Sequence, residues 1–441
     1  MIANNILRQF FTQVLGLFVG FFISIITSRI LGVEGRGDFA LIINTSSFIT
    51  LLLGFSLGSV IVYVVSSEKL DLRRTLNTLF IIILMLFLVC FTLFFLIPIP
   101  EFNVLIPKNQ DPFFSKAFLL ILFVTSLFSA LFNSVLNGKQ LFRQTQNQYF
   151  WIASITLSLY FILFYFKKNT IIDVKYFLIF YVIVNSMPVI GAFFLYVKYV
   201  RPTFKLVFLD RNQLKYLLNF SFLAYVANIL QFLSYRMDFW FVQYYCGARN
   251  LGIYSLSVNL SQMLWILPTA ISTILVSYTG SENQKDSIYH TNILSRICFS
   301  FILLVTISLT IAISTIIPFL YGDDFIESSF LFKILLIGIV PFTLTTIIAA
   351  YFAGKGEIKT NLYCSIIGFI VCLLLDLTLI PKYGNKGAAL ATVASYFSCT
   401  IFILFIYLKR TKSNLLEVVF IKKDDLLIIK KHFKSFMVKC K

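Results

Sequence analysis

A series of long apolar runs limits this chain more than any other feature of its sequence. Each run holds about 20 mostly apolar residues, which is the length that a helix needs to cross a bilayer. About 12 such runs follow one another, at 9–28, 39–66, 76–97, 117–137, 149–166, 177–197, 217–244, 252–277, 293–320, 330–352, 361–380 and 387–408. Because backbone polar groups inside lipid must be satisfied within the segment, these runs predict an all-α polytopic membrane protein with about 12 transmembrane helices.

The composition and charge agree with a membrane protein. Hydrophobic residues make up 59% of the chain and charged residues 13%, with a formal net charge of +18. In a polytopic protein, Lys and Arg gather on the cytoplasmic side next to anionic lipids, so the charge does not require a nucleic-acid partner. The first apolar run lacks a small-residue cleavage site and is expected to stay in the protein.

The distribution of Lys and Arg predicts the orientation. With both termini placed in the cytoplasm, the inside segments carry more Lys and Arg than the outside segments, and much of the excess lies after residue 408. The tail at 409–441 alternates apolar clusters with Lys pairs. It is expected either to lie on the inner leaflet as a basic amphipathic helix, bound to anionic membrane lipids, or to fray.

Two short polar motifs indicate an internal repeat. The stretch "RILGVEGRGDFAL" at 29–41 aligns with "YYCGARNLGIYSL" at 244–256 when the second half is shifted by 215 residues. Several identical residues then coincide, namely Gly32 with Gly247, Gly37 with Gly252, Leu41 with Leu256, Asn44 with Asn259 and Ser46 with Ser261. Further along, "NGKQLFR" at 137–143 aligns with "AGKGEIK" at 353–359 at an offset of 216.

A repeat of six helices has a consequence for symmetry. Because six is even, both copies begin on the same side of the membrane, which predicts two six-helix lobes related by a pseudo-two-fold axis along the membrane normal. The predicted parts are an N-terminal lobe at 1–197, a cytoplasmic linker at 198–216, a C-terminal lobe at 217–408 and the tail at 409–441.

The first motif is expected to form a tight turn of about ten residues between the first two spans. Gly32, Gly35 and Gly37 can adopt positive φ at little steric cost, so a hairpin explains the glycines. It does not explain Arg29, which lies at the membrane end of the first span.

These motifs, with "LYGDDFIESSFLFKIL" at 320–335 and "LIPKYGNKGAALATVASY" at 379–396, resemble the polysaccharide-transporter branch of the MOP superfamily, which includes the Wzx O-antigen flippases. The resemblance implies a multi-pass protein of the bacterial cytoplasmic (inner) membrane. It also implies that the protein flips undecaprenyl-diphosphate-linked oligosaccharides from the cytoplasmic to the periplasmic leaflet by alternating access. The product would be O-antigen or capsule, and other polysaccharide-assembly proteins would be partners.

Ionisable residues inside the spans are the candidate site residues, because they are costly in lipid and rarely face it. Arg236 and Asp238 lie within one span at a spacing that points them to roughly opposite helix faces. Arg236 is expected either to face a cavity and bind a diphosphate or to form a structural pair with another helix. Arg29 and Arg36 are further candidate ligands of an anionic substrate.

Asp376 lies about a turn from a span end, where it is either a proton or cation relay or an interfacial residue. With Asp238 it forms the predicted ion-coupling pair, with H⁺ or Na⁺ as the ion. Arg296 and Lys333 lie near span ends and are expected to extend their charged groups toward the interface.

Other functional classes are less well supported. An ion-coupled drug or cation exporter of the same superfamily would use buried carboxylates, and a polysaccharide polymerase would need a large outer loop. The seven Cys and two His show no metal or disulfide spacing, and no GxxxxGK[ST] motif occurs. The sequence therefore predicts a transporter that is not an enzyme and needs no metal or other cofactor.

Overall fold

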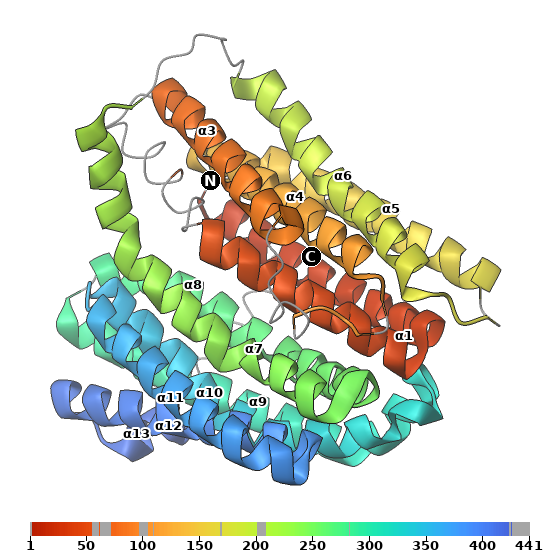
Figure 1. Cartoon of the computed structure of the whole chain (residues 1–441). Coiled ribbons are helices and arrows are strands. Elements are labelled where there is room, and N and C mark those ends of the chain that lie inside the picture. The colour runs from red at the N-terminus through yellow and green to blue at the C-terminus, as the bar shows by residue number, and fades with distance from the viewer. Residues whose placement is uncertain are drawn as a thin grey trace, which may run out of the picture. The chain divides into compact units, whose positions relative to one another are not determined.

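The computed structural model of the chain describes residues 2–54, 61, 72–96, 105–108, 110–167, 170–200, 209–281, 283–422 and 425, and all regular structure among them is helical (Figure 1). The helices are α1 (Ile2–Gly54), α3 (Leu72–Phe91) with a π-helical end (Thr92–Leu96), α4 (Pro112–Gly138), α5 (Phe142–Lys167), α6 (Val174–Val200), α7 (Arg211–Gln262), a 3₁₀ turn (Met263–Trp265), α8 (Ile266–Ser281), α9 (Gln284–Tyr321), a second 3₁₀ turn (Asp323–Phe325), α10 (Ile326–Gly354), α11 (Ile358–Tyr383), α12 (Asn385–Thr411) and α13 (Leu415–Val419). The predicted all-α fold is confirmed.

The predicted number of spans is also confirmed. Within the described ranges, ten helical segments are long and apolar enough to cross a membrane. Two of them, Thr12–Gly54 and Tyr225–Gly280, are interrupted by a non-helical glycine and supply two spans each. The second span after Gly54 apart from Ile61, residues 201–208 of the linker, and the tail beyond 422 apart from Asp425 lie outside the described residues.

The chain reverses direction at Gly32. This residue has φ 66° and ψ −173°, a conformation that is essentially restricted to glycine. The Arg36 guanidinium donates a hydrogen bond to the Ser24 carbonyl at 3.1 Å. In a straight helix these two residues would be about 18 Å apart, too far for this contact. The helix therefore folds back on itself.

The second copy of the motif makes the same reversal. Gly247 has φ 81° and ψ 177°, and the Tyr254 hydroxyl donates a hydrogen bond to the Asp238 carboxylate. In a straight helix Asp238 and Tyr254 would be about 24 Å apart. The pairing of Gly32 with Gly247 predicted from the sequence is thus confirmed by the backbone.

The second aligned motif pair also adopts one conformation. Gln140 and Gly356, which are 216 residues apart, have φ 57° and φ 77°. Their N–H groups donate to the carbonyls of Asn137 at 2.9 Å and Ala353 at 3.1 Å, respectively. The same turn after the fourth helix of each copy supports a duplicated six-helix unit.

The expectation of a ten-residue turn at 29–41 is wrong. The chain is helical up to Leu31 and again from Val33, so the turn is one residue long. Gly37 lies in the helix after the turn, where it allows a close backbone approach. A β-carbon there would lie 1.9 Å from the Ala248 carbonyl oxygen, and one at Gly252 would lie 2.0 Å from the Val33 carbonyl oxygen. The two contacts are related by the 215-residue repeat.

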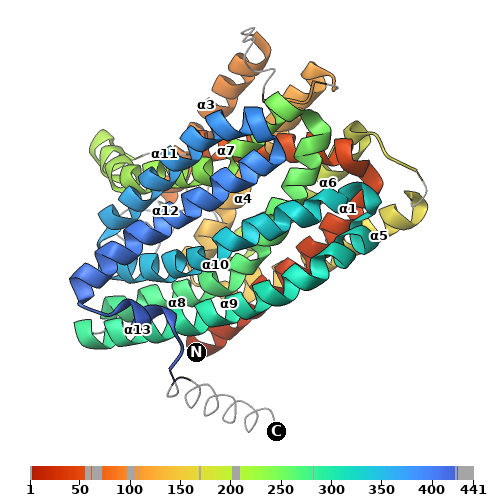
Figure 2. The same cartoon turned by 90° about the horizontal axis from the view of Figure 1, so that it is seen from below.

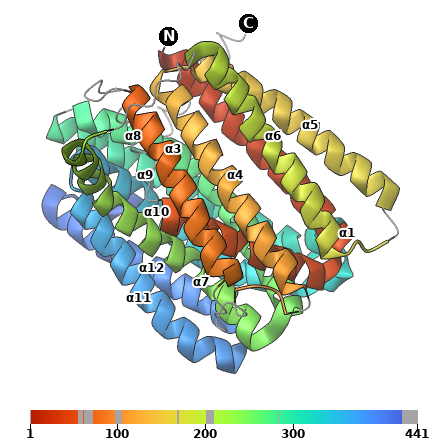
Figure 3. The same cartoon turned by 45° about the horizontal axis from the view of Figure 1, so that its top comes forward.

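The helices group into two compact units, 1–255 and 256–441. In the first unit, α3, α4, α6 and α5 lie side by side in that order, and α1 packs against α4, α5 and α6 (Figure 3). The first half of α7 joins this unit through hydrogen bonds to α1, including one from the Trp240 indole to Thr45 at 3.0 Å. The lobe boundary at 198–216 stays a prediction.

In the second unit, α10 is the most buried helix and contacts α8, α9 and α12, while α11 packs against α12 (Figure 2). Short loops connect these helices. Gly322 alone separates α9 from the 3₁₀ turn before α10, and Gly384 alone separates α11 from α12. Such short connections fix antiparallel neighbours and place the ends of the spans close together.

The expectation for Arg296 is wrong. Its side chain does not extend to the interface but is 6% exposed, and it forms a two-point ion pair with Asp425 in which both N–O distances are 2.5 Å. It also donates to the Glu417 carbonyl at 3.1 Å. The start of the tail, which includes α13 and its capping box from Asn414 and Glu417, is thereby held against α9. This contact, rather than lipid, orders the start of the tail.

Candidate functional site

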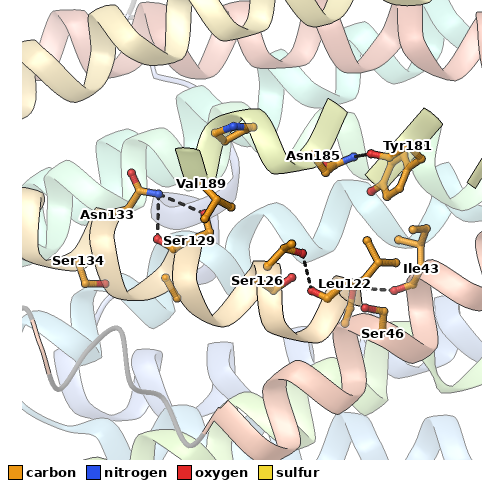
Figure 4. Close-up of a pocket in the computed structure, with 14 residues that line it drawn as sticks. Ile43, Ser46, Leu122, Ser126, Ser129, Asn133, Ser134, Tyr181, Asn185 and Val189 are labelled. Atoms are coloured by element: carbon orange, nitrogen blue, oxygen red, sulfur yellow. Dashed lines mark hydrogen bonds between the residues drawn. The ribbon is translucent and has the colours of Figure 1, made fainter. Parts of the chain in front are cut away.

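A polar cavity of about 450 Å³ lies inside the first unit among α1, α4 and α6 (Figure 4). Most of the polar side chains that line it carry a hydroxyl or an amide, namely Ser46, Ser47, Thr125, Ser126, Ser129, Asn133, Ser134, Tyr181 and Asn185. Ile43, Leu122, Ala130, Pro188 and Val189 complete the wall. No charged side chain is part of this lining, which is unusual for a polar pocket.

The sequence of α4 accounts for much of this cavity. Thr125, Ser129 and Asn133 recur every four residues, a spacing that puts side chains on one helix face. Asn133 donates to the Ser129 carbonyl at 2.9 Å, and Thr125 donates to the Leu122 carbonyl at 3.0 Å. These bonds satisfy donors within the helix. The amide oxygen of Asn133 and the lone pairs of the hydroxyls remain suited to accept hydrogen bonds from a ligand.

Helix α6 adds a second polar wall. Asn185 donates to the Tyr181 carbonyl at 2.9 Å, and the Gln148 amide donates to the Pro188 carbonyl at 3.0 Å. Pro188 lacks an N–H and so removes the helical hydrogen bond to the Val184 carbonyl beside the cavity. The sequence analysis missed this cavity. The signal that could have found it is the row of small polar residues in an otherwise apolar span.

Arg236 lies in the first half of α7 and is half-buried. Its guanidinium carbon lies 5.0 Å from the centre of the Phe239 ring, a cation–π geometry. Its backbone carbonyl accepts a hydrogen bond from the Asn44 amide at 3.1 Å, which ties α7 to α1. Its assignment as a diphosphate ligand stays a prediction.

Asp238 is 2% exposed and accepts the hydrogen bond from Tyr254 across the Gly247 turn. Tyr254 also packs edge to face on Phe239, with ring centres 5.8 Å apart. At the equivalent place in the first copy stands Phe39, which packs on Phe177 and Tyr181 instead. The hydrogen bond between Tyr254 and Asp238 is thus a feature of the second copy, and the ion-coupling role of Asp238 stays a prediction.

The two arginines of the first motif differ in their surroundings. Arg29 is exposed, whereas Arg36 is 5% exposed and donates to the Ser24 carbonyl and to the Ser24 and Ser28 hydroxyls. Arg36 therefore braces the turn at Gly32. A substrate-binding role for either residue stays a prediction.

Two further buried carboxylates lie within spans. Asp376 on α11 is fully buried, and the Cys372 thiol one turn earlier donates to it at 3.4 Å. Asp38, which the sequence analysis did not single out, is 4% exposed in α1. The structure therefore places Asp238 and Asp38 in the first unit and Asp376 in the second.

Comparison with known structures shows which fold the chain has. A structure of the lipid II flippase MurJ in an inward closed conformation aligns with a TM-score of 0.69 at 18% identity, over 96% of this chain and 89% of that one. An inward-facing multidrug resistance MATE family transporter of the MOP superfamily aligns with a TM-score of 0.68 at 14% identity, over 90% and 94%. The fold is that of a MOP-superfamily membrane protein with 12 helices in two lobes.

Sequence comparison narrows the class to a family. The polysaccharide biosynthesis protein family matches residues 2–278, and the MatE family matches residues 224–378. The chain belongs to the polysaccharide biosynthesis protein family, within the MOP superfamily.

Two curated proteins are similar to part of the chain. The probable multidrug resistance protein NorM of Bacillus thuringiensis subsp. konkukian is 26% identical over 44% of this chain and 45% of its own length. The probable lipid II flippase MurJ of Thermotoga maritima is 29% identical over 35% of this chain and 34% of its own length. The chain thus matches less than half the length of either relative.

Proposed function

We propose that this protein flips lipid-linked oligosaccharides across the bacterial cytoplasmic membrane for the synthesis of a surface polysaccharide such as O-antigen or capsule. The observation that carries the proposal is the uncharged cavity of hydroxyl and amide groups inside a membrane-spanning unit of a polysaccharide biosynthesis protein. Polar groups are costly inside a membrane protein and are retained there for a polar ligand.

The chemistry of the cavity matches a sugar better than a cationic drug. Sugars present many hydroxyls that donate and accept hydrogen bonds, and Ser129, Asn133 and Asn185 offer complementary groups. A cationic drug would be expected to need a carboxylate, and none lines the cavity. The cavity would hold part of the oligosaccharide during its passage.

The lipid diphosphate requires a cation. In this proposal Arg236, held in place by Phe239 and by the Asn44 contact at its backbone, binds the diphosphate with its planar guanidinium. Arg29, which is exposed at the Gly32 turn, would be a second ligand. Arg36 would act mainly through the shape of the turn, since both of its terminal guanidinium nitrogens already donate to Ser24 or Ser28.

The energy source in this proposal is an ion gradient, with H⁺ or Na⁺ as the coupled ion. Asp238 and Asp376 are the candidate carriers, because buried carboxylates within spans can exchange a proton or bind a cation. These two residues were predicted from the sequence. Asp38 is added as a third candidate ion-coupling residue because it is also a buried carboxylate.

A drug or cation exporter is the second candidate function. The match of the MatE family to residues 224–378 and the partial similarity to NorM favour it. Under this alternative the buried carboxylates would bind a cationic compound directly, and the hydroxyl-lined cavity would be filled with water.

The test uses a strain that lacks its own flippase and measures surface polysaccharide. The variant Ser129→Leu fills the cavity with an apolar side chain, and Ser158→Leu makes the same change at an exposed position of α5 outside the cavity. We expect wild type and Ser158→Leu to restore polysaccharide and Ser129→Leu to fail at equal membrane levels. Equal export by both variants, or efflux of cationic dyes without polysaccharide, would reject the proposal.

A further inference from the structure

A second hollow lies in the other unit and has a different character. It is a groove of about 690 Å³ among α9, α10 and α12, with walls that include Phe299, Phe330, Ile337, Pro341 and Phe397. Ile337 is 59% exposed and Phe330 is 52% exposed, although both lie within a span. Such apolar surface is favourable against hydrocarbon and unfavourable against water. The groove is therefore suited to an apolar chain.

The groove has the depth of one leaflet. From Phe330 to Pro341, the first and last α10 residues that line the groove, the axis of α10 rises about 16 Å. The hydrocarbon core of a bilayer is about 30 Å thick, so the α10 wall covers about half of it. An acyl chain of one leaflet would run along this length.

Two cationic side chains lie at one end of the groove. The Lys333 ammonium lines it and donates to the Ser314 hydroxyl of α9 at 2.8 Å. Within the part of the chain that the structure describes, no carboxylate forms an ion pair with Lys333. The Lys386 ammonium lies 5.2 Å from the centre of the Phe330 ring. A lysine inside a span with a neutral partner marks a place for an anion.

An acidic group lies beyond the lysines on the same helix face. Glu327, Phe330 and Lys333 follow one another at three-residue spacing, which places them along one side of α10. Glu327 is exposed in the first turn of the helix. From the helix end inward, the order along α10 is the Glu327 carboxylate, the Phe330 ring, the Lys333 ammonium and then the apolar residues Ile337 and Pro341.

We propose that this groove is a binding site for phosphatidylethanolamine from the surrounding bilayer. Lys333 and Lys386 bind the phosphate, Glu327 binds the ethanolamine ammonium, and one acyl chain lies along Ile337 and Pro341. The order of charges on α10 matches the order of groups in this lipid, whereas a purely anionic headgroup would meet the Glu327 carboxylate. The inference is independent of the transported substrate.

Native mass spectrometry of the full-length protein tests the proposal. The detergent-purified protein is titrated with palmitoyl-oleoyl phosphatidylethanolamine and, separately, with the phosphatidylglycerol of the same chains. We expect one tightly bound phosphatidylethanolamine and weaker phosphatidylglycerol. Lys333→Met should weaken the binding of phosphatidylethanolamine by about tenfold or more, because a hydrogen bond to a charged group is lost. The control Lys382→Met removes a lysine near the end of α11 that does not line the groove.

Two further variants keep the result interpretable. Glu327→Gln should abolish the preference for phosphatidylethanolamine over phosphatidylglycerol, and Ile337→Trp should block either lipid by filling the groove. Unchanged phosphatidylethanolamine affinity in both Lys333→Met and Ile337→Trp would overturn the site. A wild-type preference for phosphatidylglycerol would overturn the assignment of the headgroup.

Discussion

The carbonyl oxygen of Ala248 lies 1.9 Å from the point where a β-carbon on Gly37 would stand. The related contact, between Gly252 and the Val33 carbonyl, is equally close at 2.0 Å. Backbone atoms of α1 and α7 thus touch at two points that the internal repeat relates to each other. Only glycine fits at these positions, because a carbonyl in a helix cannot move aside as a flexible side chain can.

Replacing Gly37 tests this close approach. Gly37→Ala should force α1 and α7 apart and lower the free energy of unfolding by about 1–3 kcal/mol or more. Gly20→Ala, at a helical position in α1 where a β-carbon meets nothing within 4 Å, should be neutral or slightly stabilising. Thermal unfolding in detergent measures both. Equal melting temperatures for the two variants would contradict the contact.

The turn at Gly247 makes a separate prediction. A β-carbon there meets no atom within 4 Å, so any cost of Gly247→Ala comes from the backbone conformation alone. With φ 81° and ψ 177°, the strain should be about 1–3 kcal/mol. The same thermal assay applies. A stable Gly247→Ala protein would show that the turn can form without a glycine.

The ion pair between Arg296 and Asp425 should control the docking of the tail. Asp425→Asn leaves a buried guanidinium without its carboxylate and should cost about 3–5 kcal/mol. We expect faster hydrogen exchange in α13 in this variant. Lys422→Met, which removes the exposed ion pair with Glu417, should lower the stability of the docked tail by less than about 1 kcal/mol. The paired change of Arg296→Met with Asp425→Leu should recover much of the protection. Slow exchange in Asp425→Asn would argue against the clamp.

The same clamp should depend on pH. Burial alone would raise the pKa of Asp425, but hydrogen bonds from Arg296 and from the Lys422 N–H outweigh it and lower the pKa below its ordinary value. Because docking lowers the pKa of Asp425, its stabilisation of the docked tail is fully present at pH values above the unfolded pKa of about 3.9. The stabilisation is lost as the pH falls through the folded pKa. Hydrogen exchange in α13 should therefore accelerate only below about pH 4, after correction for intrinsic rates. Detachment at neutral pH would contradict this.

Two substitutions at Arg236 distinguish the contribution of its charge from that of its planar guanidinium. Arg236→Ala should abolish polysaccharide export, while Arg236→Lys keeps the charge but loses the planar fork and should give partial export. Membrane levels must match those of wild type. Full export by the alanine variant would exclude a ligand role, whereas loss of the protein from the membrane would indicate a structural pair instead.

The proposed coupling by Asp376 has a distinct readout. Asp376→Asn is nearly isosteric and removes the charge of a fully buried carboxylate. Uptake of labelled lipid-linked oligosaccharide into inverted vesicles should then lose its dependence on an imposed H⁺ or Na⁺ gradient. If uptake by Asp376→Asn still depends on the ion gradient at normal protein levels, the coupling must be assigned to another residue.

The sequence predicted those features that depend on local pattern. Apolar runs of fixed length identified the spans, and the positions of Gly32 and Gly247 identified the repeat before any geometry was known. The same reasoning failed for Gly37, because a contact between two helices far apart in sequence has no local signature. The prediction for Arg296 failed for the same reason, because its partner, the Asp425 carboxylate, lies 129 residues away in the sequence.

The cavity was missed for a related physical reason. Serine and asparagine in an apolar span can satisfy their own donors on the preceding helical turn, as Asn133 does, so their presence in a sequence does not require a cavity. Only the packing of α4 against α6 and α1 shows that these side chains line one cavity.

The offset between the two copies changes by only one residue, from 215 at the first turn to 216 at the turn after the fourth helix. One inserted residue inside a span would rotate everything beyond it by about 100° and turn lipid-facing groups inward. The two copies differ by substitution, as at Phe39 and Tyr254, but the register of these two turns differs by only one residue. The helices between these turns have not kept one length, because α3 with its π-helical end spans Leu72–Leu96 whereas the corresponding α9 spans Gln284–Tyr321, so the two turns keep their register although the third crossing differs between the copies.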